Sequence, residues 1–122
     1  MSERIQVARA ISRAISYLHK QKIVIRDLCP ESIGFDGNNQ VKLFDLGLAR
    51  HESEAILDIQ LKGNFRYMAP EIIICQPAGI PGDIYSFGVT LWELVTLQKP
   101  YDAYFVESEG KGEKKATFEQ KK

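Results

Sequence analysis

The apolar segment 84–97 constrains the fold of this chain more than any other feature. Its large side chains would cover nearly every face of a helix, although the segment also includes Glu93. Such a helix must be covered on several sides, and the segment is shorter than the roughly 20 apolar residues that a membrane span needs. We therefore predict a buried helix that has Asp83 as its N-cap, extends to Leu97 and ends before Pro100.

The preceding part of the chain predicts one further long helix and several short strands. Residues 4–20 have the pattern of an amphipathic helix, because apolar side chains recur three or four positions apart. The members of this stripe are Ile5, Ala8, Ile11, Ile15 and Leu18. The β-branched run 23–25 predicts a short strand, and the apolar runs 33–35 and 41–44 predict a hairpin around an Asp-Gly turn.

The remaining segments predict little regular structure. Residues 48–68 are irregular and polar, which indicates a long loop, and such loops are usually functional or disordered. Residues 69–75 predict a short helix that begins at an Ala-Pro-Glu sequence. Residues 105–122 are rich in Lys and Glu and nearly free of apolar side chains, which predicts a disordered polar tail. The fold class that follows is a mostly helical α+β domain over residues 1–104.

Charge and cysteine content exclude several classes of function. Sixteen basic and sixteen acidic residues give a formal net charge of zero, whereas a nucleic-acid-binding surface needs a basic excess. Cys29 and Cys75 lie far apart, so neither a disulfide framework nor a zinc site is predicted. The chain begins without an apolar run, so no secretory signal is expected. We expect a cytoplasmic protein, with a nuclear location left open, that has no nucleic-acid or membrane partner.

Three short motifs follow one another in a fixed order. Residues 25–32 read IRDLCPES after the predicted strand, residues 45–47 read DLG at the end of the hairpin, and residues 69–71 read APE after the long loop. This set resembles the H-R-D-L-x-x-x-N, D-F-G and A-P-E motifs of eukaryotic protein kinases. Over residues 1–104 the chain is similar to part of the C-lobe of a serine/threonine kinase of the tyrosine-kinase-like type. The resemblance implies protein substrates or partners, with ATP and Mg²⁺ as cofactors.

The resemblance also implies a role for each position of the catalytic loop. Asp27 stands where kinases carry the carboxylate that orients the substrate hydroxyl, next to Arg26 of the same motif. Asp45 stands where kinases carry the carboxylate that holds magnesium against the phosphates of ATP. Ser32 replaces the Asn that contributes a second magnesium ligand, and we expect it to bind the metal weakly. Taken alone, either aspartate is explained equally well as a carboxylate that caps a turn.

Substitutions within the loop argue against full activity. Cys29 occupies the position of the family's catalytic-loop Lys, and a thiol does not neutralise charge on a transferring phosphoryl group. Ser32 is shorter than Asn and reaches a metal differently. The sequence also contains neither the Gly-rich G-x-G-x-x-G loop nor the V-A-I-K strand that kinases carry in the N-lobe. We expect a truncated kinase domain that is catalytically inactive as this chain and that does not bind MgATP appreciably.

Three interpretations of this pattern stay open. The first is an active kinase whose N-lobe lies outside the sequence. The second is a pseudokinase module that binds protein partners without chemistry. The third is a decayed kinase fragment without activity. We also expect the apolar segment 84–97 to be incompletely covered, so that this chain, expressed alone, is only partly ordered and prone to aggregate.

The resemblance assigns structural and regulatory positions as well. Glu71 of the APE motif pairs in kinases with an Arg from later helices, so a buried, unpaired carboxylate is expected here. Asp83 is expected to hold the backbone of the catalytic loop at position 25. Ser53 is the candidate for regulation by phosphorylation, with Arg26 as the partner of its phosphate. The alternative for Ser53 is an incidental surface serine.

Overall fold

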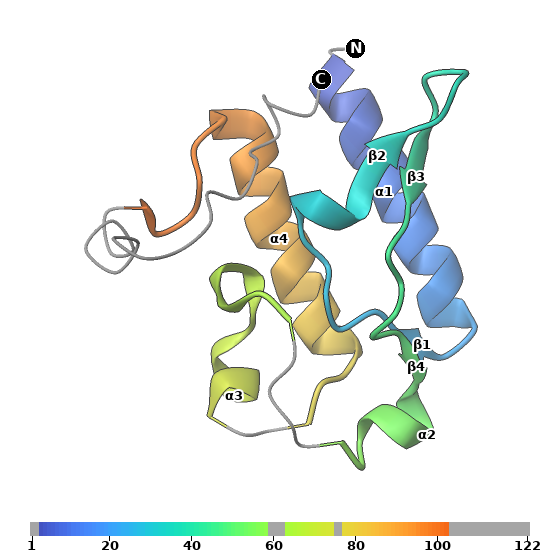
Figure 1. Cartoon of the computed structure of the whole chain (residues 1–122), viewed down its shortest axis with the longest axis vertical. Helices are drawn as coiled ribbons and strands as arrows, with labels where there is room; N and C mark the ends of the chain where they lie inside the picture. Colours follow the sequence, from blue (N-terminus) through green and yellow to red (C-terminus); the bar gives the residue numbers. More distant parts are fainter. Residues whose placement is uncertain (1–2, 59–62, 75–76, 103–122) are drawn as a thin grey trace.

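Two long helices lying side by side form the body of the molecule (Figure 1). The computed structural model describes residues 3–58, 63–74 and 77–102. Helix α1 (Glu3–Lys20) packs against α4 (Ile80–Thr96) and against the hairpin formed by β2 (Ile33–Phe35) and β3 (Val41–Leu43). The predicted class, a mostly helical α+β fold with a small hairpin, is confirmed. The predicted tail over residues 105–122 lies outside the described residues.

The buried side of α1 differs from the predicted stripe at its beginning. Val7, Ile11 and Ile15 are buried, whereas Ile5 is 52% exposed. Residues four apart form a nearly straight ridge along a helix, and this ridge packs into the core. The core cluster also contains Ile25, Leu28, Ile33 and Leu94. The predicted face is therefore right from Ala8 onward, whereas Ile5 is not part of it.

The hairpin has the predicted strands and an antiparallel register. Ile33 pairs with Leu43 and Phe35 pairs with Val41. The Asp36 side chain closes the turn, because its Oδ1 accepts the backbone N–H groups of Asn38 and Gln40, each at 2.9 Å. Such a local side-chain contact is a usual reason for Asp at a turn. The hairpin thus fixes the backbone position of Asp45, two residues after the end of β3.

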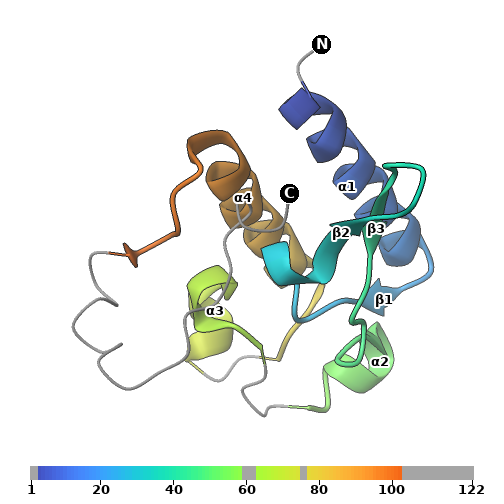
Figure 2. The ribbon, with the colours of Figure 1, turned by 45° about the horizontal axis from the view of Figure 1, so that its top comes forward.

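The predicted long loop over residues 48–68 is wrong in part, because regular structure interrupts it. Strand β4 (Arg50–His51) pairs antiparallel with β1 (Ile23–Val24). It continues into helix α2 (Glu52–Ala55), and a 3₁₀ turn, η2 (Phe65–Tyr67), follows later. The two short strands satisfy each other's backbone groups, which neither segment reveals by its own sequence. Figure 2 shows α2 beside β1 at the end of the molecule opposite the hairpin turn.

Helix α4 begins earlier than the sequence predicted. Its N-cap is Gly79, so the prediction that Asp83 is the N-cap is wrong, and Asp83 lies in the first turn. The helix ends at Thr96, where Leu97 adopts a left-handed conformation with φ 57° and its N–H bonds to Glu93 O at 2.7 Å. Helix α3 (Pro70–Ile73) has its C-cap at Ile74, and the predicted end at residue 75 lies outside the described residues.

The buried face of α4 is largely polar, which the apolar sequence did not suggest. The buried polar side chains on this helix are Asp83, Ser86, Thr90 and Glu93. By contrast Ile84, Trp92 and Val95 are exposed. Among the described residues, therefore, the apolar surface of α4 is only partly covered, as expected for a helix that needs neighbours on several sides.

Candidate functional site

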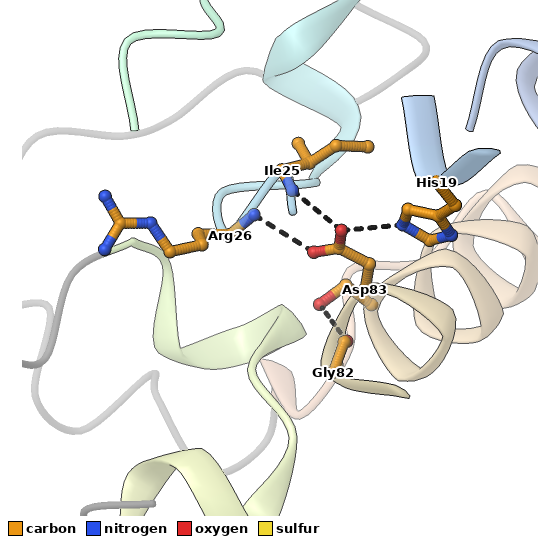
Figure 3. Close-up of polar contacts among 6 residues, drawn as sticks. His19, Ile25, Arg26, Gly82 and Asp83 are labelled. Carbon is orange, nitrogen blue, oxygen red and sulfur yellow. Dashed lines mark hydrogen bonds and ion pairs between the residues drawn. The ribbon is translucent and has the colours of Figure 1, made fainter. Parts of the chain in front are cut away.

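Asp83 holds the backbone at the start of the predicted catalytic loop, residues 25–32. Its Oδ2 accepts the backbone N–H of Ile25 at 2.7 Å, and its Oδ1 accepts the N–H of Arg26 at 3.0 Å. The ring of His19, at the end of α1, lies 2.9 Å from the same Oδ2 (Figure 3). The carboxylate is 2% exposed and joins α1, the loop and α4. The expected contact between Asp83 and position 25 is thus present, and it also explains why β1 ends at Val24.

Arg26 follows in a left-handed backbone conformation, with φ 68°. Its Nε donates to Leu48 O at 2.5 Å, and its Nη1 lies 2.9 Å from Asp58 Oδ2. The side chain is 3% exposed, and the other terminal nitrogen is buried without a hydrogen-bond partner among the described residues. A guanidinium keeps its charge under all ordinary conditions. This charge is therefore held in the interior beside the loop that follows β4.

Asp27 comes next and is half-buried, between Arg26 and the returning loop. Gly63 lies directly against it: a Cβ on this glycine would be 3.2 Å from Arg26 O and 3.3 Å from Asp27 Oδ1. Gly63 also has φ 109°, a conformation that favours glycine. The close approach fixes one side of the Asp27 carboxylate. The role of Asp27 as the residue that orients a hydroxyl remains a prediction.

Cys29, at the position of the family's Lys, is buried in the loop. Its Sγ lies 4.0 Å from Asp27 Oδ1. Burial, together with the neighbouring carboxylates of Glu31 and Asp27, raises the pKa of the thiol to about 12. The side chain is accordingly a neutral thiol at physiological pH. It provides neither a positive charge beside Asp27 nor a reactive thiolate.

The Ser32 hydroxyl is engaged by the loop itself. It accepts the Cys29 N–H at 3.2 Å and lies 2.8 Å from Cys29 O and 3.3 Å from Asp27 O. A hydroxyl has one donor and two acceptor positions, so at most one lone pair is left. The side chain is buried at 3% exposure. This orientation fits a residue that closes a turn, and it does not fit a magnesium ligand well.

The side chain of Asp45, unlike that of Ser32, is open to solvent. Asp45 follows β3 in a left-handed conformation with φ 59°. The residue before it contacts Ser32, because Phe44 N donates to Ser32 O at 2.9 Å. An open carboxylate of this kind fits a magnesium ligand. The assignment of Asp45 and Ser32 as a pair of magnesium ligands stays a prediction.

The two other predicted positions, Glu71 and Ser53, are both exposed. Glu71 is exposed at the start of α3, so the expected cost of a buried, unpaired carboxylate does not arise. Ser53 lies in α2, and its hydroxyl is 2.8 Å from His51 Nδ1. Arg26, the expected phosphate partner of Ser53, is instead paired with Asp58. Phosphorylation at Ser53 stays a prediction.

The sequence did not predict a buried polar cluster around Tyr67 and Glu93. Tyr67 donates its hydroxyl hydrogen bond to Glu93 Oε1 at 2.8 Å, and Glu93 is 1% exposed. Burial raises the pKa of Glu93, with Glu31 adding to the increase, and burial likewise raises the pKa of Tyr67. Both carboxylate oxygens of Glu31 and one of Glu93 are buried without partners among the described residues. The only sequence signal was an acidic residue within the apolar segment.

Two features of the described residues bear on possible partners. No helix there combines the length and apolar character that a membrane crossing requires. In the same residues no group of three or more His, Cys, Asp or Glu side chains is placed to hold a metal ion.

Comparison with known proteins identifies what this arrangement resembles. The family model described as "Protein kinase domain" matches residues 1–121. The serine/threonine-protein kinase STY46 of Arabidopsis thaliana is 38% identical over 97 residues, which is 80% of this chain and 17% of the relative. The MAP kinase kinase MKK1/SSP32 of Saccharomyces cerevisiae is 38% identical over 95 residues, which is 78% of this chain and 18% of the relative. The mitogen-activated protein kinase kinase kinase 13 of Mus musculus is 37% identical over 91 residues, which is 75% of this chain and 10% of the relative. The chain thus spans less than a fifth of the length of each.

Proposed function

Because this chain belongs to the protein kinase family, we propose that it carries a serine/threonine-type catalytic loop that is catalytically inactive in this chain. The observation that carries the proposal is the buried, neutral thiol of Cys29 beside Asp27. Kinases stabilise the transferring phosphoryl group almost entirely with positioned charge. Without a cation at this position, the loop retains the carboxylate but loses part of that stabilisation.

The surroundings of the two predicted magnesium ligands, Asp45 and Ser32, support the same proposal. Mg²⁺, when bound, would neutralise the phosphates of ATP, and Asp45 offers it an exposed carboxylate. Ser32 keeps its hydroxyl on the backbone of Cys29. A single carboxylate from this chain holds magnesium weakly, because the ion keeps most of its waters and exchanges easily. The expected cofactors, ATP and Mg²⁺, therefore bind weakly or not at all.

Two measurements test the proposal. Calorimetric titration of the full chain with MgATP is expected to give no dissociation constant in the low micromolar range. A phosphoryl-transfer assay on a general protein substrate should give the same background for the natural chain and for Asp27→Asn. Activity in the natural chain that Asp27→Asn abolishes would overturn the proposal, and the matched variant excludes a contaminating kinase as its source.

A second candidate function is a protein-binding module of the pseudokinase kind. The observation that favours it is an apolar groove of about 590 Å³ beside α4, lined by residues that include Tyr85, Trp92 and Tyr101. Apolar surface of this extent usually marks a contact site or causes aggregation. Protein partners in the cytoplasm are part of this proposal. A monomer with a sharp thermal transition in near-UV circular dichroism would favour the binding module, and a broad transition with aggregation would favour a decayed fragment.

A further inference from the structure

Arg26 is a buried cation whose charge requires a nearby anion. Its side chain is 3% exposed, and its charge is permanent. A buried charge without a partner is strongly unfavourable, so the surroundings must supply one. The carboxylate in contact with its guanidinium is that of Asp58, at 2.9 Å from Nη1. The sequence had assigned this place to a phosphate on Ser53.

The segment that carries Asp58 is attached to the catalytic loop at further points. Strand β4 pairs with β1, and Glu52 N bonds to Lys22 O at 2.7 Å. Asp58 N bonds to Ala55 O at 3.1 Å, which ties the acid to the end of α2. Gly63, beyond it, lies against Arg26 and Asp27. The backbone contacts of β4, α2 and Asp58 itself therefore hold the Asp58 side chain beside Arg26.

We propose that Asp58 is the permanent counter-ion of Arg26 and positions the catalytic loop at Arg26 and Asp27 without phosphorylation. The carboxylate takes the place that a phosphate on the loop would otherwise fill, and it does so in the unmodified chain. Ser53 is exposed and bonded to His51, so its modification leaves the pair intact. The proposal deepens the proposed function and rests on Arg26 and Asp27 being the catalytic loop. Asp58 is a positioning residue, because it acts through Arg26.

Amide hydrogen exchange of the full chain tests the proposal and requires no nucleotide. Asp58→Asn should raise exchange at the amides of residues 25–28 by roughly tenfold or more, since loss of a buried charge partner favours local opening. Asp58→Glu should restore most of the protection. Glu54→Gln removes the same charge from an exposed position on α2 and should change exchange less than about twofold. The unmodified chain and the chain with phosphoserine at position 53 should exchange alike.

Two results would overturn the proposal. One is equal exchange in Asp58→Asn and Glu54→Gln, and the other is a gain of protection at residues 25–28 when Ser53 is phosphorylated. If Asp58→Asn fails to fold, the double variant Arg26→Met, Asp58→Asn decides the matter. Recovery of folding in the double variant supports the proposal, because the unpaired charge is then the cause, whereas failure of both variants contradicts it. Tight MgATP binding would overturn the proposed function and would leave this readout unchanged, so the two failures are distinguishable.

Discussion

His19 and Asp83 are 64 positions apart in the sequence, yet His19 Nε2 lies 2.9 Å from Asp83 Oδ2. The same carboxylate accepts two backbone N–H groups from the catalytic loop. One side chain therefore satisfies three donors that belong to two other segments. The loop conformation depends on α4 through this residue.

Replacement of Asp83 tests that dependence. Asp83→Asn leaves one acceptor oxygen for the three donors, so at least one buried N–H loses its partner. We expect the free energy of unfolding to fall by about 2–4 kcal/mol, the range for orphaned buried polar groups. Urea titration followed by far-UV circular dichroism measures the change. Glu52→Gln, at the exposed ion pair with Lys22, should cost no more than about 1 kcal/mol, and equal losses in both variants would contradict the assignment.

The buried Glu93 predicts a pH dependence of stability. Its folded-state pKa is raised above the ordinary value of 4.5, mainly by burial. The group therefore contributes most stability below pH 4.5, and that contribution is lost as pH rises through the raised pKa. Glu93→Gln keeps an acceptor for Tyr67 and removes the charge. The variant should equal the natural chain near pH 4 and exceed it in stability at pH 7, and a constant difference across this range would show that Glu93 does not titrate as described.

Cys29 should resist alkylation in the folded chain. Its pKa is raised to about 12 from 9.0, mainly by burial, so the thiolate is scarce at pH 8. The stability that the neutral thiol contributes is complete below pH 9 and declines as pH rises toward 12. Iodoacetamide labelling with peptide mass spectrometry should show slow reaction at Cys29 in buffer and fast reaction in urea. Rapid native labelling would contradict the burial and the neutral thiol on which the proposed inactivity rests.

Thr90 offers a site for stabilisation. The residue is fully buried, and its hydroxyl has no hydrogen-bond partner within the described part of the chain. Thr90→Val replaces the hydroxyl by a methyl group of similar shape and removes an unsatisfied polar atom. We expect a gain of roughly 0.5–2 kcal/mol in the free energy of unfolding, measured by thermal melting. A loss of stability would show that the hydroxyl has a partner in solution.

The uncovered side of α4 should control association of the chain. Ile84 and Val95 are exposed at 53% and 63%, with Trp92 on the same helix at 44%. The variant Ile84→Lys, Val95→Lys is expected to reduce light scattering and to leave the melting temperature nearly unchanged, since these side chains contribute little to the core. Lys20→Ala, at an exposed position on α1, serves as a surface control. Unchanged scattering in the double variant would place the association elsewhere.

The sequence by itself determined the local structure and the family. Hydrophobic spacing predicted α1 and α4, the Asp-Gly turn predicted the β2–β3 hairpin, and the order of three motifs predicted the kinase resemblance. These features depend on residues that are only a few positions apart, so they can be predicted from the sequence. The spacing also identified Asp27 and Asp45, because their motifs are contiguous.

Only the tertiary structure decided which groups meet across the chain. Strand β4 forms because β1 offers it backbone partners, and Asp83 joins the catalytic loop because α4 passes beneath it. The carboxylate on Arg26 is that of Asp58 and not a group on Ser53. These outcomes depend on how buried polar groups find partners from distant segments. No pattern of spacing along the sequence specifies such a pairing, since the partners become neighbours only when the helices pack.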